Sequence, residues 1–253
     1  MKNLSFISAM LCVAALSVSC CGQPEIETTT VGLSEEIALA DGRDNRLSVE
    51  ISAEYPVFKT GNEAGMTISS EITGALFGEE YMSMDPEAAA IAYKEALGQE
   101  YREENLQLLE DEVFEGSASL NWDDIVSGSV EGRKDNIISY VVEHYVFRGG
   151  AHGMTSVTAY NFDTRSGKEI KETDFFKKDY EEKLTKLLTA RLPEAVGGPE
   201  NMEMLFIAEV EPNDNFCITE DGVTFIYNHY EIAPYAMGVI RITIPWNELE
   251  GLY

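Results

Sequence analysis

The sequence predicts an α+β protein of two coupled lobes, each a mainly antiparallel sheet packed by a helix. Three observations lead to this prediction. Residues 47–53 alternate apolar and polar side chains, as a half-buried strand does. Asp85 and Pro86 open a long apolar stripe at helical spacing. The order strand, helix, strands then occurs a second time after Gly149 and Gly150, and this order is typical of α+β folds.

The first half of the chain provides the longer of two predicted helices. Its apolar face consists of Ala90, Tyr93, Leu97, Tyr101 and Leu108, at spacings of 3, 4, 4 and 7 residues. Strands at 117–130 and 136–148 follow, joined by a turn around Gly132. The second of these strands is apolar on both faces, which predicts a central place in the sheet. Residues 66–77 fit a strand and a helix equally well.

The second half of the chain provides the shorter helix. Asp179 and Glu182 have the spacing of a capping box, in which each side chain satisfies a backbone N–H of the other. An apolar stripe follows, and it comprises Tyr180, Leu184, Leu187, Leu188 and Leu192. Because proline and glycine interrupt helical hydrogen bonding, we expect the helix to end at Pro193 and Gly197.

Four further strands are predicted in this half. The first spans 156–162 and is followed by a turn at 163–167. Strands at 216–219 and 223–227 form a hairpin around a D-G step, and a strand at 239–244 closes the sheet. Cys217 lies inside the hairpin, where we expect a small buried apolar side chain rather than a disulfide.

The composition is strongly acidic. The 253 residues include 45 Asp and Glu but only 18 Lys and Arg, which gives a formal charge of −27. Nucleic-acid binding needs lysine and arginine to displace counterions from phosphates, so this charge argues against that class of protein. It argues equally against electrostatic docking to anionic lipid. The charge favours attraction of cationic partners.

The N-terminus has the pattern of a secretory signal. Lys2 precedes an apolar run from Leu4 to Val18, and small residues follow it. The run is shorter than the ~20 residues that span a bilayer. A cysteine directly after such a run resembles a bacterial lipoprotein signal, whose thiol receives fatty acyl chains. We take Cys20 as the acceptor, with Cys21 and a non-lipidated signal as the alternatives.

The predicted organisation follows from these features. Residues 1–19 form the lipoprotein signal peptide. Residues 20–44 are acidic, rich in threonine and poorly periodic, which predicts a flexible tether. The N-terminal lobe spans 45–148 and the C-terminal lobe spans 149–253.

Motifs for catalysis and metal binding are missing from the sequence. There is no G-x-S-x-G elbow, no glycine-rich phosphate loop and no H-E-x-x-H or C-x-x-C pair. We therefore predict no catalytic residue, no metal and no cofactor. Paired carboxylates carry no signal here, because a chain with 45 acidic residues offers many such pairs.

Two groups of residues are candidates for ligand binding. His152 follows Gly149 and Gly150, and backbone without Cβ lets a ligand or another chain approach closely. The alternative is that the glycines form a turn and that His152 bonds a carbonyl. Tyr230 and Tyr235 belong to a stretch rich in amphipathic rings, which serve binding surfaces well. The alternative for these rings is a place in the core or at a sheet edge.

Three motifs in the second half point to a known family. They are GGAH at 149–152, NFDTRSGKE at 161–169 and YEIAPYAMG at 230–238. Within 147–176 and 215–249 the chain resembles the extracytoplasmic RsiV-like domain, a family largely of unknown function. The first lobe resembles the companion domain found near the N-terminus of the PdaC polysaccharide deacetylase.

The resemblance implies an α+β fold of two coupled lobes. The best-understood members of the RsiV-like type are anti-sigma factors whose external domain binds lysozyme. This chain departs from that type, because it shows no sigma-binding segment and no spanning helix. The deacetylase motifs T-F-D-D and H-x-x-x-H are also missing. The resemblance therefore implies binding rather than deacetylation.

We expect a non-enzymatic, lipid-anchored protein of the cell envelope, periplasmic or surface-exposed. Its membrane contact is the N-terminal lipid, and its ligand is a macromolecule such as lysozyme or another cationic protein. One alternative is an enzyme or accessory module that acts on cell-wall glycan. Another is a structural envelope lipoprotein without a ligand.

Overall fold

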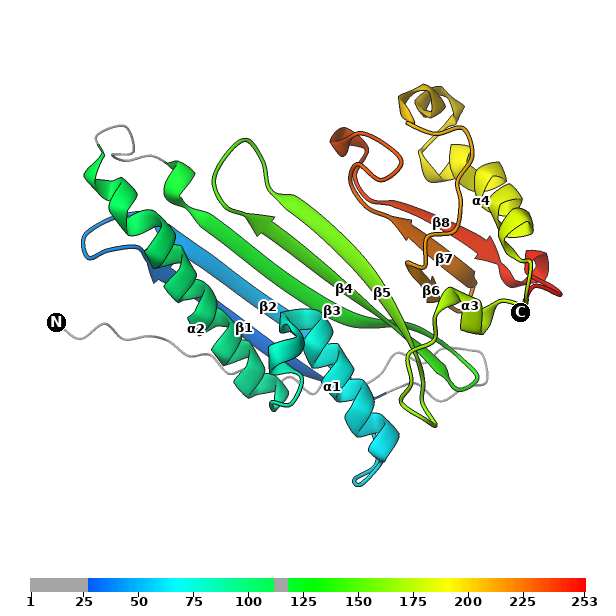
Figure 1. Cartoon of the computed structure of the whole chain (residues 1–253), viewed down its shortest axis with the longest axis horizontal. Coiled ribbons are helices and arrows are strands. Elements are labelled where there is room, and N and C mark those ends of the chain that lie inside the picture. The colour runs from blue at the N-terminus through cyan, green and yellow to red at the C-terminus, as the bar shows by residue number, and fades with distance from the viewer. Residues whose placement is uncertain (1–26, 112–117) are drawn as a thin grey trace. The chain divides into compact units, whose positions relative to one another are not determined.

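The computed structural model describes residues 27–111 and 118–253 (Figure 1). The predicted signal peptide, Cys20, Cys21 and the first part of the predicted tether lie outside these residues. In the described chain the fold is α+β, as predicted. It consists of a five-stranded mixed sheet with helices and a three-stranded antiparallel sheet packed by a helix.

The larger sheet has the strand order β1-β2-β3-β4-β5. Its strands are β1 (Thr28–Ala38), β2 (Arg46–Pro56), β3 (Trp122–Lys134), β4 (Ile137–Phe147) and β5 (Met154–Asp163). Strand β4 lies between β3 and β5, so its prediction as an inner strand is confirmed. Its residues Ile138, Tyr140, Val141 and Val142 are buried.

Strand β1 corrects the predicted tether. Residues 28–38 pair antiparallel with β2 along their whole length, with Leu33 opposite Ile51. Only Val31 and Ile37 of this strand are buried, and the rest is at least partly exposed. An edge strand of this kind lacks the clean apolar alternation of a half-buried strand, which is why its sequence looks like a linker.

Two helices follow β2, namely α1 (Glu63–Phe77) and α2 (Pro86–Asn105). Helix α1 resolves the ambiguous segment 66–77 as a helix. The predicted start of α2 is confirmed, because Asp85 Oδ1 accepts hydrogen bonds from the N–H groups of Glu87 at 3.1 Å and Ala88 at 3.4 Å.

Helix α2 packs against β1 and β2 (Figure 1). Gly98 makes this approach close, because a Cβ there would lie 2.9 Å from Ile37 Cδ1. The glycine that weakens the isolated helix thus lies where the helix contacts the Ile37 side chain of the edge strand.

The smaller sheet has the order β6-β7-β8, with both pairs antiparallel. Its strands are β6 (Phe216–Ile218), β7 (Gly222–Tyr227) and β8 (Ile240–Pro245). The predicted hairpin is confirmed, and Thr219 N donates to Gly222 O across its turn at 2.8 Å. Cys217 is 1% exposed, and burial raises the pKa of its thiol to about 11.

Helix α4 (Glu181–Ala195) packs against β8, and a short helix α3 (Glu172–Phe175) precedes it. The predicted capping box is wrong, because Tyr180 is the N-cap and Asp179 has a left-handed backbone with φ of 63°. Pro193 lies inside the helix rather than at its end. Short 3₁₀ helices occupy Glu79–Tyr81, Leu106–Glu110, Ala118–Leu120, Pro199–Met204, Tyr235–Met237 and Trp246–Glu248.

The chain divides into two compact units, and the division differs from the predicted boundary between residues 148 and 149. Among the described residues, the first unit contains 27–59, 69–111, 118–127 and 145–153, and the second contains 60–68, 128–144 and 154–253. Strand β5 follows the predicted boundary but pairs within the larger sheet. Each unit therefore combines segments that are distant in the sequence.

Asparagine side chains connect β5 to the β6–β7 sheet within the second unit. Asn228 accepts from Val157 N at 2.7 Å through Oδ1 and donates to Val157 O at 3.0 Å through Nδ2. Asn215 bonds Ala159 N at 2.8 Å and Val157 O at 2.9 Å in the same way. Each carboxamide thus replaces the donor and acceptor of a strand residue, which leaves these backbone groups of β5 satisfied.

Candidate functional site

The Gly149–Gly153 loop is the first predicted binding region. Gly149 and Gly150 have left-handed backbones with φ of 79° and 105°. A Cβ on Gly149 would lie 2.1 Å from Ser119 O, and one on Gly153 would lie 2.4 Å from the ring of Tyr145. The space beside these two glycines is therefore filled by groups of the protein itself, namely Ser119 O and the Tyr145 ring.

His152, the histidine of this loop, is exposed, and its Nδ1 lies 2.9 Å from Gly153 O. A contact between His152 and a carbonyl oxygen is what the alternative interpretation of this loop, a glycine turn, predicts. A ligand role for Gly149, Gly150 and His152 stays a prediction.

An ion pair between the half-buried Arg148 and the buried Asp124, which the sequence did not predict, anchors the start of this loop. Arg148 Nη2 donates to Asp124 Oδ2 at 2.7 Å, and its guanidinium lies 4.6 Å from the centre of the Trp122 ring. Asp124 is fully buried and also accepts from Tyr93 Oη at 2.9 Å. Burial, followed by the nearby Asp124 charge, raises the pKa of Tyr93. These bonds compensate a carboxylate that would otherwise be costly in the interior.

The sequence contains a weak signal for this pair. Asp124 occupies an inward position of β3 between the buried Trp122 and Val126, while the apolar Ile125 is exposed. An acidic residue at an inward position of an alternating strand indicates a buried partner. The partner itself is 24 residues further along the chain and has no local signature.

The second predicted region is the loop from Asn228 to Gly238. The structure brings its two candidate rings together, with 6.0 Å between the ring centres of Tyr230 and Tyr235. His229 stacks on Tyr235 at 4.5 Å, and its Nδ1 lies 3.2 Å from Tyr235 O. Tyr230 is 52% exposed and has a left-handed backbone with φ of 66°. Such a conformation is unusual for a bulky residue and costs about 1–3 kcal/mol.

Polar contacts within the second unit hold this loop in place. Glu231 accepts from Asn228 N at 2.8 Å through Oε2 and from Asn213 Nδ2 at 2.6 Å through Oε1. Asn228 is in turn bonded to Val157 of β5. The loop is thereby attached at its start to two neighbouring segments, which fixes the backbone that presents Tyr230.

A neighbouring segment adds a third ring. Phe206 N donates to Ile232 O of the loop at 2.9 Å, and Tyr227 Oη, at the end of β7, donates to Glu211 O at 2.8 Å. Phe206 is 59% exposed, and both Glu211 and Glu231 are exposed. We call Phe206, Tyr230, Tyr235, Glu211 and Glu231 the aromatic-acidic surface. Phe206 lies outside the stretch from which the sequence predicted a binding surface.

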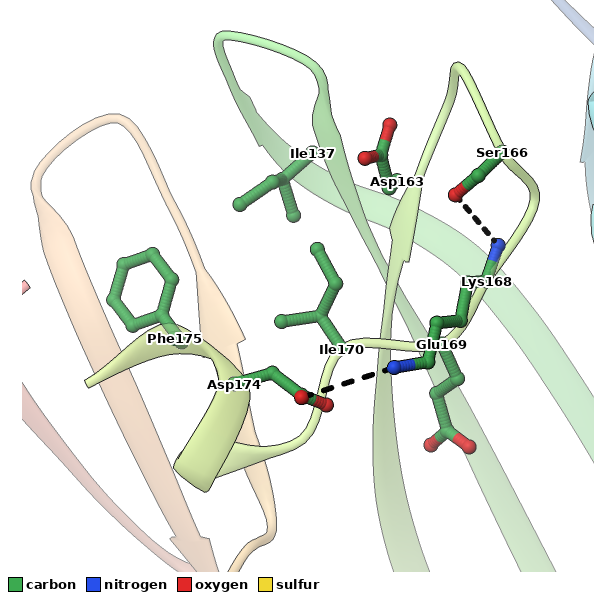
Figure 2. Close-up of a pocket in the computed structure, with 8 residues that line it drawn as sticks. All are labelled: Ile137, Asp163, Ser166, Lys168, Glu169, Ile170, Asp174 and Phe175. Atoms are coloured by element: carbon green, nitrogen blue, oxygen red, sulfur yellow. Dashed lines mark hydrogen bonds and ion pairs between the residues drawn. The ribbon is translucent and has the colours of Figure 1, made fainter. Parts of the chain in front are cut away.

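A small pocket lies elsewhere in the second unit (Figure 2). It has a volume of about 280 Å³, and its lining residues are Ile137, Asp163, Ser166, Lys168, Glu169, Ile170, Asp174 and Phe175. Its charged groups pair with one another or with neighbours, since Lys168 Nζ lies 3.8 Å from Asp174 Oδ1 and Lys171 Nζ lies 2.6 Å from Glu169 Oε1. Hydrogen bonds from Arg165 lower the pKa of Asp163. The pocket therefore offers no unpaired acid and base in contact.

Residues 27–111 and 118–253 contain neither a cluster of metal ligands nor a helix of membrane-spanning character. No group of three His, Cys, Asp or Glu side chains there could hold a metal ion. Within the same residues no helix is long and apolar enough to cross a membrane.

Comparison with known families now identifies both parts of the chain. The family described as "Deacetylase PdaC" matches residues 43–155, and the family described as "Protein of unknown function (DUF3298)" matches residues 173–247. The chain combines a PdaC domain with a DUF3298 domain. This confirms the family resemblance predicted for both halves. The aromatic-acidic surface lies in the DUF3298 segment, and the Gly149–Gly153 loop lies at the end of the PdaC segment.

Solved structures show the same architecture. A DUF3298-family protein from Bacteroides fragilis is 29% identical, with a TM-score of 0.80 over 90% of this chain and 93% of that chain. A DUF3298-family protein from Pseudomonas aeruginosa is 20% identical, with a TM-score of 0.62 over 90% of this chain and 94% of that chain. The second likeness concerns the fold alone. No curated protein matches the chain significantly.

Proposed function

We propose that this protein is a non-enzymatic, lipid-anchored envelope protein that binds a cationic macromolecule, such as lysozyme, through the aromatic-acidic surface. One observation carries the proposal. The rings of Tyr230 and Phe206 are more than half exposed on adjacent segments, and the same two segments carry the exposed Glu211 and Glu231.

The chemistry of this surface favours a basic protein partner. Aromatic rings are frequent anchors of protein interfaces, and lysine or arginine placed over such a ring gains about 0.5–2 kcal/mol. Carboxylates on the same segments complement the same cations. The left-handed backbone at Tyr230 adds a further argument, because strain of this kind persists where presentation of the side chain is useful.

The overall charge acts at longer range. A chain with a formal charge of −27 attracts a basic protein before contact, which raises association rates by about 10–10³ at low salt. Because salt screens this attraction, we expect binding to weaken as ionic strength rises.

The binding prediction uses Tyr230→Gly in the purified protein. Glycine removes the ring and also relieves the left-handed backbone, so the variant keeps or gains stability while binding falls by about 30-fold. Affinity for lysozyme is measured by titration at low and moderate salt, and folding is measured by thermal unfolding.

Asp135→Gly is the matched control, because Asp135 has φ of 52° in an exposed turn without a ring. It is expected to keep its affinity. Failure of the unsubstituted protein to bind at tens of micromolar in either salt would remove lysozyme as the partner. Turnover of a cell-wall glycan by the purified protein would contradict the non-enzymatic part of the proposal.

The anchoring prediction concerns Cys20. Cys20→Ser removes the thiol that receives the lipid, and since two or three acyl chains give stable anchoring, the variant should leave the membrane fraction. Cys21→Ser is the control and should remain membrane-bound. Fractionation and mass spectrometry of the N-terminal peptide provide the measurement. Release by Cys21→Ser alone would make Cys21 the acceptor, and release by neither would contradict lipid anchoring near position 20.

A further inference from the structure

An aromatic cluster in the second unit surrounds a lysine of the protein itself. Lys134 Nζ lies 4.2 Å from the centre of the Trp246 ring and 5.6 Å from that of Tyr253. The Trp246 and Tyr253 rings are 5.2 Å apart and meet at 66°, so they form two walls around the ammonium. The geometry is that of a cage for a positively charged group.

The walls of this cage are held in position. Trp246 Nε1 donates to Thr219 O at 3.2 Å and to Glu220 O at 3.0 Å, which fixes the indole at the β6–β7 turn. Phe175 stacks on Tyr253 at 5.7 Å with only 4° between the ring planes. The cage is thus formed by side chains that other contacts orient, as preorganised recognition requires.

The close packing of strand β3 against β6 explains how Lys134 reaches the cage. Gly132 packs against β6, and a Cβ there would lie 2.3 Å from Ile218 O. Lys134 is two residues further along the same strand and therefore lies on the same face. The close contact at Gly132 brings the lysine over the ring of Trp246, which is half-buried.

We propose that the cage of Trp246 and Tyr253, with Phe175 stacked on Tyr253, is a binding site for an alkylammonium group, and that Lys134 occupies it when no ligand is bound. The position of Lys134 indicates the chemistry of the ligand, because its side-chain ammonium already lies against these rings. Two sources share this chemistry, namely a choline-type headgroup and the side chain of a lysine. The site uses none of the residues of the aromatic-acidic surface, so it goes beyond the proposed function.

The experiment titrates the purified protein with choline and, separately, with Nα-acetyl-lysine, followed by NMR of the ligand and of the Trp246 indole N–H. Each binds with a dissociation constant of about 1–10 mM. The neutral isostere 3,3-dimethylbutanol lacks the charge and is expected to bind at least about tenfold more weakly. The ligand that binds more tightly, choline or Nα-acetyl-lysine, indicates whether the natural ligand is a choline-type headgroup or a lysine side chain.

Lys134→Ala empties the cage and is expected to strengthen ligand binding about tenfold, because the ligand no longer displaces an internal cation. Lys168→Ala is the control, since it removes one positive charge from the same unit at a side chain that is 74% exposed. It should change the affinity by less than about twofold.

Trp246→Leu and, separately, Tyr253→Leu each remove one wall and should abolish detectable binding. The second variant guards against a folding defect in the first, because Tyr253 is 38% exposed. Equal binding of choline and its neutral isostere would overturn the proposal. So would an unchanged affinity in Lys134→Ala.

Discussion

At the scale of single residues, two adjacent glycines show two different physical reasons why a position favours glycine. Gly149 and Gly150 both have left-handed backbones, which favour glycine whatever surrounds them. Only Gly149 also lacks space, because Ser119 O occupies the position of its Cβ. For Gly150, nothing lies within 4 Å of that position.

This difference gives a prediction. Gly150→Ala introduces backbone strain alone and should lower the free energy of unfolding by about 1–2 kcal/mol. Gly149→Ala adds a clash with backbone and should cost about 3 kcal/mol or more. Urea unfolding of both variants measures the two losses. Equal losses would show that the chain near Ser119 moves freely out of the way.

The residues of the candidate surface were predictable only in part. The sequence predicts Tyr230 and Tyr235 as binding residues because amphipathic rings suit interfaces, and the structure places their rings together. The sequence does not predict Phe206, because its contact with Ile232 joins segments that are 26 residues apart. The left-handed backbone of Tyr230 was also not predictable, since no local residue preference demands it.

At the scale of elements, side-chain amides connect β5 to the smaller sheet. Asn215 and Asn228 each offer one donor and one acceptor to backbone groups of β5. Asparagine is normally a poor strand residue, but a carboxamide reproduces the pairing of a peptide group. Asn215 and Asn228 therefore pair with the backbone of β5, a structural role that strand preferences do not predict.

Asn228→Asp tests this connection. A carboxylate keeps the acceptor for Val157 N but loses the donor to Val157 O and places negative charge near that carbonyl oxygen. We expect a loss of about 2–3 kcal/mol in the free energy of unfolding and faster hydrogen exchange at Val157. Asn247→Asp, at an exposed position, is the control and should change stability by less than about 0.5 kcal/mol. An equal effect of the two substitutions would contradict the role of Asn228.

Helix ends show which elements the sequence can predict. The start of α2 depends on Asp85 and Pro86, whose effects are local, and the prediction is confirmed. The predicted start of α4 is wrong, because Asp179 adopts a left-handed backbone and Tyr180 takes the N-cap position. Tyr180 is buried and donates to Glu172 Oε1 at 2.6 Å, so a tertiary contact outweighs the local capping pattern.

At the scale of the whole molecule, the same Glu172 links stability to pH. Glu172 is 5% exposed, and its carboxylate also accepts a hydrogen bond from Asp214 N at 2.9 Å. Burial raises the pKa of this carboxyl above its usual value, although the hydrogen bond from Tyr180 opposes the shift. The folded protein therefore keeps a proton that the unfolded chain has already released. Stability from this group declines as pH rises from about 4.3 through the folded pKa.

Glu172→Gln removes this titration. Because glutamine stays neutral, the stability of the unsubstituted protein relative to the variant should fall as pH rises from 4 to 7. Urea unfolding at several pH values provides the measurement. Glu182→Gln is the contrast, since Lys186 lowers the pKa of Glu182, and any pH trend there runs the opposite way. A difference between the unsubstituted protein and Glu172→Gln that does not change with pH would contradict the argument.

The sequence by itself determined the α+β class, the main helices, the β6–β7 hairpin, the two families and the acidic charge, because these depend on local pattern and composition. The tertiary structure decided that residues 28–38 are a strand, that β5 pairs within the larger sheet and that Asp124 meets Arg148. It also decided that Lys134 lies against Trp246. Each of these features joins segments distant in the chain, and such contacts depend on the packing of the whole unit rather than on any single stretch of residues.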